Sequence, residues 1–133
     1  MSQIVNANLW ALGYKTMRAQ LKSLHSPDVD LDSYYPNNAD CFSFLLQAFI
    51  GPDVEDGEDV FNFIVCTPQW LEVEKKGEIT FGANYIIVTN YNLKDIEEHL
   101  KSYAQRCVGD SWVEVANKIA KVGEWEFDNY QAY

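Results

Sequence analysis

The sequence predicts an α+β fold, and three observations support this class. Two apolar runs, rich in aromatic and β-branched residues, flank a short polar loop that contains Asp56-Gly57. This arrangement is typical of a β-hairpin, which we place at about 41–66. After Asn92 the spacing of apolar residues changes from that of strands to that of helices. Strands first and helices later predict an antiparallel sheet, centred on the hairpin, with two C-terminal helices on one face.

The remaining strands are predicted from shorter patterns. Residues 17–23 alternate apolar and polar side chains, which favours a half-exposed strand, although the residue types also suit a helix. The hairpin runs carry large apolar residues on both faces, which places them in the middle of the sheet. Residues 79–88 predict a third hydrophobic strand, with Gly82 marking a bulge or a close approach. The tail, 124–130, alternates aromatic and acidic residues and predicts a strand or an extended cover.

The helices are predicted from their caps and apolar faces. A first helix is expected at about 93–107, because Asn92 can cap it and apolar residues recur along one face. A second is expected at about 112–122, where Ser111 opens a capping box. A turn of helix is also expected at 68–76, since proline suits the first helical position.

Length and composition predict one domain over residues 1–133. An apolar share of 47% and an aromatic share of 14% exclude a disordered chain. No apolar stretch reaches the roughly 20 residues of a membrane span, and the N-terminus lacks the basic start of a secretory signal. The three cysteines lie within apolar patterns. We expect buried free thiols in a reducing cytoplasm, with a Cys41–Cys66 pair as the alternative.

The charge is strongly acidic and unevenly placed. A net charge of -10 argues against nucleic acid or an anionic membrane as a direct partner, and it permits a basic protein partner. Between Lys22 and Lys75 there is no lysine or arginine, whereas eleven aspartate and glutamate residues occur. Two interpretations remain open. The stretch accelerates association with a positively charged protein, or it is a solvated rim around the hairpin loops.

Catalytic signals are weak in this sequence. His25 and His99 stand alone, and no His or Cys residues have the spacing of metal ligands. The alternating residues Asp28, Asp30 and Asp32 lack the glycine and glutamate of a calcium loop. No glycine-rich phosphate loop occurs. We therefore expect no enzymatic activity, no cofactor and no metal.

Several local motifs, taken together, resemble the immunity protein 8 family of bacterial polymorphic toxin systems. The motifs are Ile50-Gly51, Gly57-Glu58-x-x-Phe61-x-Phe63-x-Val65-Cys66-Thr67-Pro68-x-Trp70-Leu71, Gly82 before Tyr85-Ile86-Ile87-Val88, Ile96, Ser111-Trp112 and Trp125-Glu126-Phe127. They span about Met17 to Tyr130, so the first sixteen residues look like an addition.

The resemblance implies an antitoxin made beside a secreted toxin, as in contact-dependent inhibition. Such a protein is expected to bind the C-terminal domain of its cognate toxin in the cytoplasm and to block the active site. These toxin domains are often nucleases, whose clefts are usually basic because they attract phosphates. An acidic inhibitor is steered towards such a cleft by the same field.

The toxin contacts are expected on exposed acidic positions, because the apolar motif residues have the spacing of a core. The candidate contact residues are Asp28, Asp30, Asp32, Tyr34, Tyr35, Asp53, Glu55, Asp56, Glu58 and Asp59. For the tyrosines, we favour a role in pinning the 25–40 segment to the body of the protein, and contact with a partner is the alternative. Two other functions stay open: an adaptor domain for a different basic protein, and a small hydrolase or ligand-binding domain with an acidic cleft.

Overall fold

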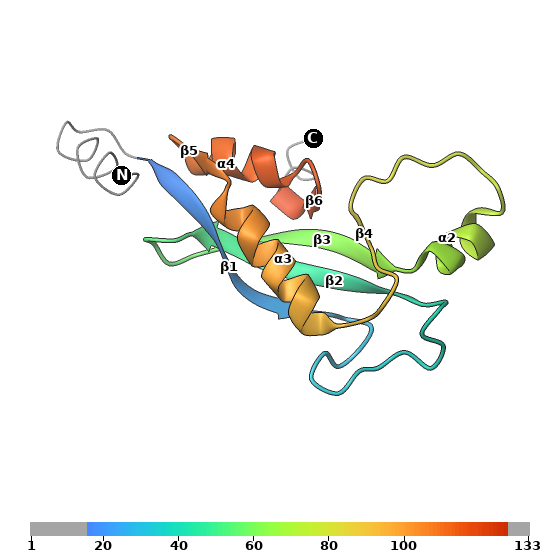
Figure 1. The fold of residues 1–133 in the computed structure, drawn as a ribbon. Helices are drawn as coiled ribbons and strands as arrows, with labels where there is room; N and C mark the ends of the chain where they lie inside the picture. Colours follow the sequence, from blue (N-terminus) through green and yellow to red (C-terminus); the bar gives the residue numbers. More distant parts are fainter. Residues whose placement is uncertain (1–15, 128–133) are drawn as a thin grey trace.

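The computed structural model describes residues 16–127, which form a curled mixed sheet with three helices (Figure 1). The elements are β1 (Met17–His25), β2 (Ser43–Pro52), β3 (Asp59–Cys66), α2 (Pro68–Lys75), β4 (Tyr85–Ile87), α3 (Leu93–Gln105), β5 (Val108–Gly109), α4 (Trp112–Ile119) and β6 (Glu124–Trp125). The predicted α+β class is confirmed. Most of the expected N-terminal addition, and the end of the expected tail segment, lie outside the described residues.

The strand order is β4-β3-β2-β1-β5, and β6 pairs with β3 outside this path. The hairpin pairs β2 with β3 from Ser43 opposite Cys66 to Ile50 opposite Asp59. The prediction of a purely antiparallel sheet is wrong at β4, which runs parallel to β3. The physical reason is α2, a third helix that carries the chain back, since parallel neighbours need a crossover connection.

The predicted strand at 79–88 is much shorter in the structure, where only Tyr85–Ile87 pairs. The edge of β3 has room for two short partners. Its second half pairs with β4, and its first half pairs with β6 through Phe61 opposite Trp125. Residues before Tyr85 therefore find no free edge and form a loop. Gly82 lies in this loop with open space around it, so the expected bulge or close approach is wrong.

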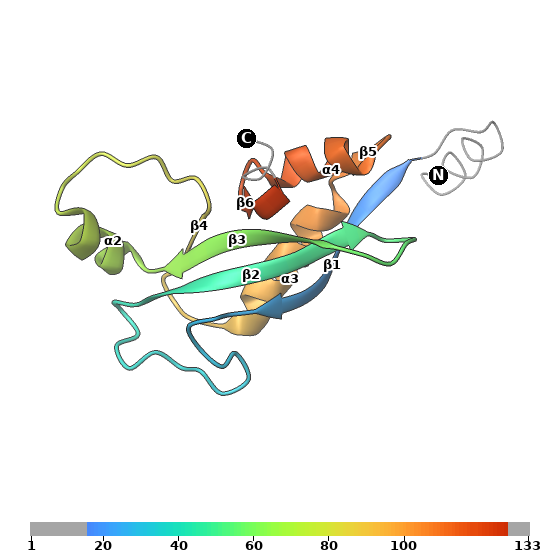
Figure 2. The same ribbon diagram turned by 180° about the vertical axis from the view of Figure 1, so that it is seen from behind.

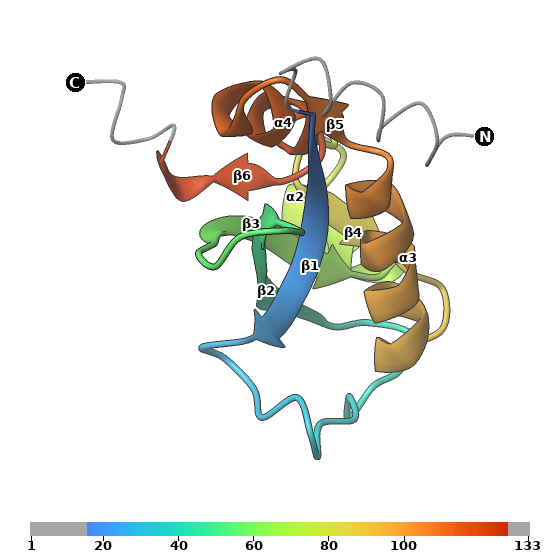
Figure 3. The ribbon, with the colours of Figure 1, turned by 90° about the vertical axis from the view of Figure 1, so that its left-hand side faces the viewer.

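The core lies between one face of the sheet and the helices α3 and α4. Alternate residues of β2 and β3 are buried, because successive side chains of a strand point to opposite faces. The largest fully buried side chains are Phe61, Phe63, Leu46, Ile50, Ile119, Val65, Val115, Thr67 and Cys66. Figures 1 and 3 show α3 and α4 against this face of the sheet. The opposite face, seen in Figure 2, has no helix in front of β2 and β3.

The helix starts follow the predicted caps. The side chain of Asn92 accepts a hydrogen bond from the Asp95 amide at the start of α3, at 3.3 Å. Ser111 accepts one from the Glu114 amide at the start of α4, at 3.2 Å. Each bond satisfies one of the amides that a helix leaves unpaired in its first turn. Both helices begin as predicted and end two or three residues earlier, as helix ends commonly do.

Candidate functional site

The predicted contact residues fall into two groups at opposite ends of the sheet (Figure 1). One group lies in the connection from β1 to β2, and the other in the tight connection from β2 to β3. The strand between them, β2, has ten residues and spans roughly 30 Å. We call segments 26–42 and 67–84 the loop end, and residues 53–59 the hairpin end. The fold therefore does not bring the two acidic groups together.

The hairpin end carries four exposed carboxylates beside a basic strand. These residues are Asp53, Glu55, Asp56 and Glu58. The ammonium group of Lys22, on β1, donates a hydrogen bond to the backbone oxygen of Glu55 at 2.5 Å. Because Lys22 reaches this loop, its charge offsets part of the local negative potential. The sequence could not show this compensation, since Lys22 is 33 positions from Glu55.

Asp59, at the start of β3, has a structural role that the sequence reasoning missed. One of its carboxylate oxygens, Oδ2, accepts hydrogen bonds from the indole nitrogen of Trp112 at 2.7 Å and from that of Trp125 at 3.0 Å. These bonds join β3 to α4 and β6. A signal was present in the sequence, because an indole N–H usually finds a partner when tryptophan is buried. The carboxylate is thus held within the scaffold.

The acidic loop between β1 and β2 is fixed by short-range hydrogen bonds. Asp28 accepts a bond from the Leu45 amide at 2.8 Å, which ties the loop to β2. Asp30 accepts one from the Asp32 amide at 3.1 Å, a local turn that aspartate favours. All three carboxylates remain exposed. The loop therefore presents its charges from a defined backbone.

The two neighbouring tyrosines of this loop differ in role. The ring of Tyr34 meets the rings of Phe44 and Tyr91 edge to face, at centroid distances of 5.2 and 5.4 Å. Burial raises the pKa of Tyr34 above its ordinary value. Tyr35 also meets Tyr91, at 6.1 Å, but remains 63% exposed. Tyr34 pins the loop to the body, which is the role favoured above for both tyrosines, whereas Tyr35 stays accessible.

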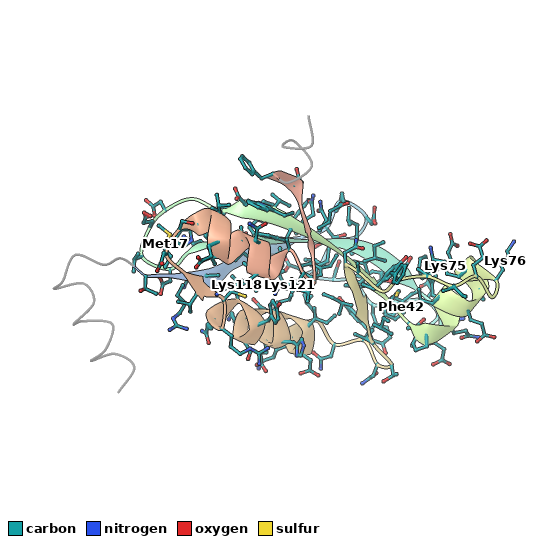
Figure 4. The ribbon with its side chains drawn as sticks, turned by 90° about the horizontal axis from the view of Figure 1, so that it is seen from above. Met17, Phe42, Lys75, Lys76, Lys118 and Lys121 are labelled. Atoms are coloured by element: carbon teal, nitrogen blue, oxygen red, sulfur yellow. The ribbon has the colours of Figure 1, made fainter. Side chains whose placement is uncertain are left out.

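The two ends carry similar excesses of negative charge, because residues 53–59 contain five acidic residues and no basic one, and Lys22 adds one positive charge beside them. Segments 26–42 and 67–84 contain seven acidic residues and two basic ones, so their net charge is -7 + 2 = -5. All seven acidic residues are exposed. The two basic residues, Lys75 and Lys76, lie at α2, and Lys118 and Lys121 lie far from them beside α4 (Figure 4). The loop end therefore keeps a net negative field, as the hairpin end does.

The same end carries exposed apolar side chains that the sequence reasoning placed inside a strand. Ile79 and Phe81 are 98% and 92% exposed, in the loop that leads from α2 to β4. Val73 of α2 and Ile87 of β4 are also exposed. Apolar patches of this kind commonly mark contact surfaces. Their alternation with polar residues predicted a strand, because the sequence does not show that β6 occupies part of the free edge of β3.

Other chemically active side chains are dispersed over the described part of the chain. Among residues 16–127 no group of three His, Cys, Asp or Glu side chains can hold a metal ion. A groove of about 420 Å³ between β4 and α3 includes Asp95 and His99, both exposed on the same helix. Within the described residues, no hydrogen bond joins His99 to another side chain. The groove therefore presents no paired base and nucleophile.

All three cysteines are free, so the alternative of a Cys41–Cys66 pair is wrong. Burial raises the pKa of the Cys66 thiol and of the Cys107 thiol. A raised pKa lowers the fraction of thiolate, which is the reactive form. Neither buried thiol is therefore activated as a nucleophile.

None of the helices between residues 16 and 127 is long and apolar enough to cross a membrane.

Exposed carboxylates, an accessible tyrosine and a projecting apolar loop at one end of a packed sheet are features of a protein-binding scaffold. Residues 19–130 match the sequence model of the family described as Immunity protein 8. The chain belongs to the Immunity protein 8 family, which confirms the resemblance carried by the motifs. No curated protein and no solved structure matches the chain.

Proposed function

We propose that this immunity protein binds the C-terminal domain of a cognate secreted toxin in the cytoplasm of the producing cell. Binding covers the active site of the toxin, and the immunity protein contributes no chemistry of its own. The observation that carries the proposal is membership of the Immunity protein 8 family, which makes neutralisation of a toxin the expected activity. The net charge of -10 supports a basic nuclease as the toxin.

The electrostatic argument concerns both the rate and the place of binding. A nuclease cleft that attracts phosphates has positive potential, so it also attracts exposed carboxylates. Such steering raises association rates well above those of neutral pairs and weakens as salt is added. Exposed acidic side chains at a defined loop are therefore suited to this task, whereas a nucleic-acid partner would be repelled.

The loop end is the better of the two candidate surfaces. A standard interface covers about 800 Å² on each partner, a patch roughly as wide as the separation between the two ends. An interface of this width that is centred on one end does not reach the other end, so a single toxin domain binds mainly at one of them. Both ends are negatively charged, and the loop end adds the accessible Tyr35 and exposed apolar side chains to the carboxylates of Asp28, Asp30 and Asp32. Asp59 and Tyr34 are assigned to the scaffold because their partners lie within the chain.

Co-expression tests this function directly. The toxin domain encoded beside this chain is expressed with and without it, and growth is followed. We expect arrest with the toxin alone and rescue when this chain is present. The purified pair should form a complex whose association rate falls as salt rises. The proposal would be refuted if this chain gave no rescue and formed no complex with the toxin domain. Rescue from a toxin that leaves nucleic acids intact would refute the nuclease part alone.

A further inference from the structure

We infer that Ile79 and Phe81 are the apolar anchor by which this chain docks onto the toxin domain. The inference rests on the proposed function and names the interface within it. It concerns the loop between α2 and β4, residues 77–84, which projects from the loop end in both Figure 1 and Figure 2. None of the ten contact residues predicted from the sequence lies in this loop.

The exposure of these two side chains is extreme for their type. Ile79 is 98% exposed and Phe81 92% exposed, so neither gains any packing from the fold. Val73 and Ile87, also exposed, come from the two elements that this loop connects. Single exposed apolar residues are ordinary, but several gathered at one end of a fold are typical of an interaction site. Aromatic side chains, phenylalanine included, are enriched at the cores of interfaces, and binding hot spots lie in well-packed pockets of the partner.

The direction of the side chains supports an external partner. Glu78, Thr80 and Gly82 line a groove of about 360 Å³ between this loop and α2. Ile79 and Phe81 alternate with them in the sequence and do not line the groove. In an extended segment, alternate side chains point to opposite sides. Glu78 and Thr80 therefore border the groove while remaining exposed, and Ile79 and Phe81 lie away from it.

The strand that follows offers a second kind of contact. β4 is the last strand in the sheet order, with β3 on one side. A terminal strand presents a row of backbone N–H and C=O groups on its other side, and an extended segment of a partner can pair with them. Ile87 is exposed on this strand. A protein partner can therefore combine backbone pairing at β4 with an apolar pocket for Phe81.

The charge of the loop end selects the toxin rather than a second copy of this chain. Two copies that met through this surface would bring together two regions of net charge -5, and each chain carries -10 in total. Like charges at an interface repel, whereas a basic rim around an apolar pocket is complementary to this surface. An apolar centre with a charged rim is the ordinary anatomy of an interface between different proteins. The occupant is thus a basic toxin domain.

The test measures binding of the toxin domain encoded beside this chain. The double variant Ile79→Ser/Phe81→Ser is compared with Val113→Ser, a matched control because Val113 is 48% exposed on α4. We expect the double variant to weaken the complex by about 100-fold and the control by about twofold or less. Thermal unfolding should stay unchanged, since both side chains are exposed. Wild-type affinity in the double variant would overturn the inference.

Photocrosslinking gives an independent readout that does not depend on affinity. A benzophenone amino acid is placed at position 81 or, as control, at position 113. We expect a crosslink to the toxin domain from position 81 and none from position 113; the reverse pattern would overturn the inference. A dimer of the free protein that is lost in Phe81→Ser would also overturn the inference, because it would show that a second copy of this chain occupies the surface. A wild-type chain that binds no toxin would refute the proposed function, and the anchor with it.

Discussion

The two ends of the sheet look alike in the sequence and differ in the structure. The hairpin end and most of the loop end lie within the stretch between Lys22 and Lys75, and both ends are rich in carboxylates. At the hairpin end Lys22 reaches the loop, and Asp59 holds two tryptophans. At the loop end seven exposed acidic residues face two lysines, beside an apolar loop. The difference between the two ends is the exposed apolar loop, and a run of acidic residues suits an interface best where such an apolar centre lies beside it.

The largest effect is expected for Asp59→Ala, at the hairpin end. The change removes the acceptor of two charge-assisted hydrogen bonds and leaves the indole nitrogens of Trp112 and Trp125 without it. We expect the free energy of unfolding to fall by about 3 kcal/mol. Urea denaturation measures this loss. Asp59→Asn keeps one neutral acceptor, so its free energy of unfolding should fall by about half as much.

Wild-type stability in Asp59→Ala, together with weaker toxin binding, would contradict this assignment. Asp59 would then be a toxin contact, and the hairpin end would no longer differ from the loop end in holding a carboxylate within the scaffold.

The next effect contrasts Gly51, beside the hairpin end, with Gly82 at the loop end. A Cβ at buried Gly51 would overlap the backbone oxygen of Gly57 in the hairpin loop, so Gly51→Ala should destabilise the fold by about 2 kcal/mol. Gly82 has no atom near its Cβ position, and Gly82→Ala should raise the stability by about 0.5 kcal/mol. Thermal unfolding of both variants checks the pair. Equal effects would mean that the two ends are equally tightly packed.

Charge reversal compares the ends as steering surfaces. Asp32→Lys/Asp40→Lys and Asp53→Lys/Asp56→Lys change the net charge by the same amount, at the loop end and the hairpin end respectively. We expect the loop-end pair to slow association with a basic toxin by about tenfold at low salt, and the hairpin pair by about twofold. Stopped-flow mixing over a range of salt concentrations measures both rates. A larger effect from the hairpin pair would move the interface to that end.

The smallest effect concerns the cysteines. Cys66 and Cys107 are buried and their thiol pKa values are raised, so a smaller fraction of each is thiolate at a given pH. Cys41, beside the acidic loop, is half-buried. We expect a thiol reagent at about pH 8 to modify Cys41 well before the other two. Toxin binding at the loop end should slow that reaction, and an unchanged rate would argue against coverage of Cys41.

Local patterns were enough to predict several parts of this fold. The hairpin, the strand at Met17 and the starts of the two late helices were read from alternation, turn residues and caps. Each of these features depends on interactions between residues that are near neighbours in the chain. The family was also identified from short motifs in a fixed order, and the match over residues 19–130 confirms it.

The candidate site was less predictable, because it depends on which segments meet. The ten contact residues were chosen by charge along the chain, and the fold divides them between two distant ends. Asp59 and Tyr34 were included because the sequence does not reveal Trp112, Trp125 or Tyr91 as their partners.

By itself, the sequence determined the class of fold, the family and the strong negative charge of this protein. Only the tertiary structure decided that β4 is short and parallel and that Ile79 and Phe81 face the solvent. The reason is competition for one strand edge: β6, about 60 residues away in the chain, pairs with β3 and excludes the loop from the sheet. Alternation specifies that a segment can be a strand, but an available neighbour determines whether it becomes one.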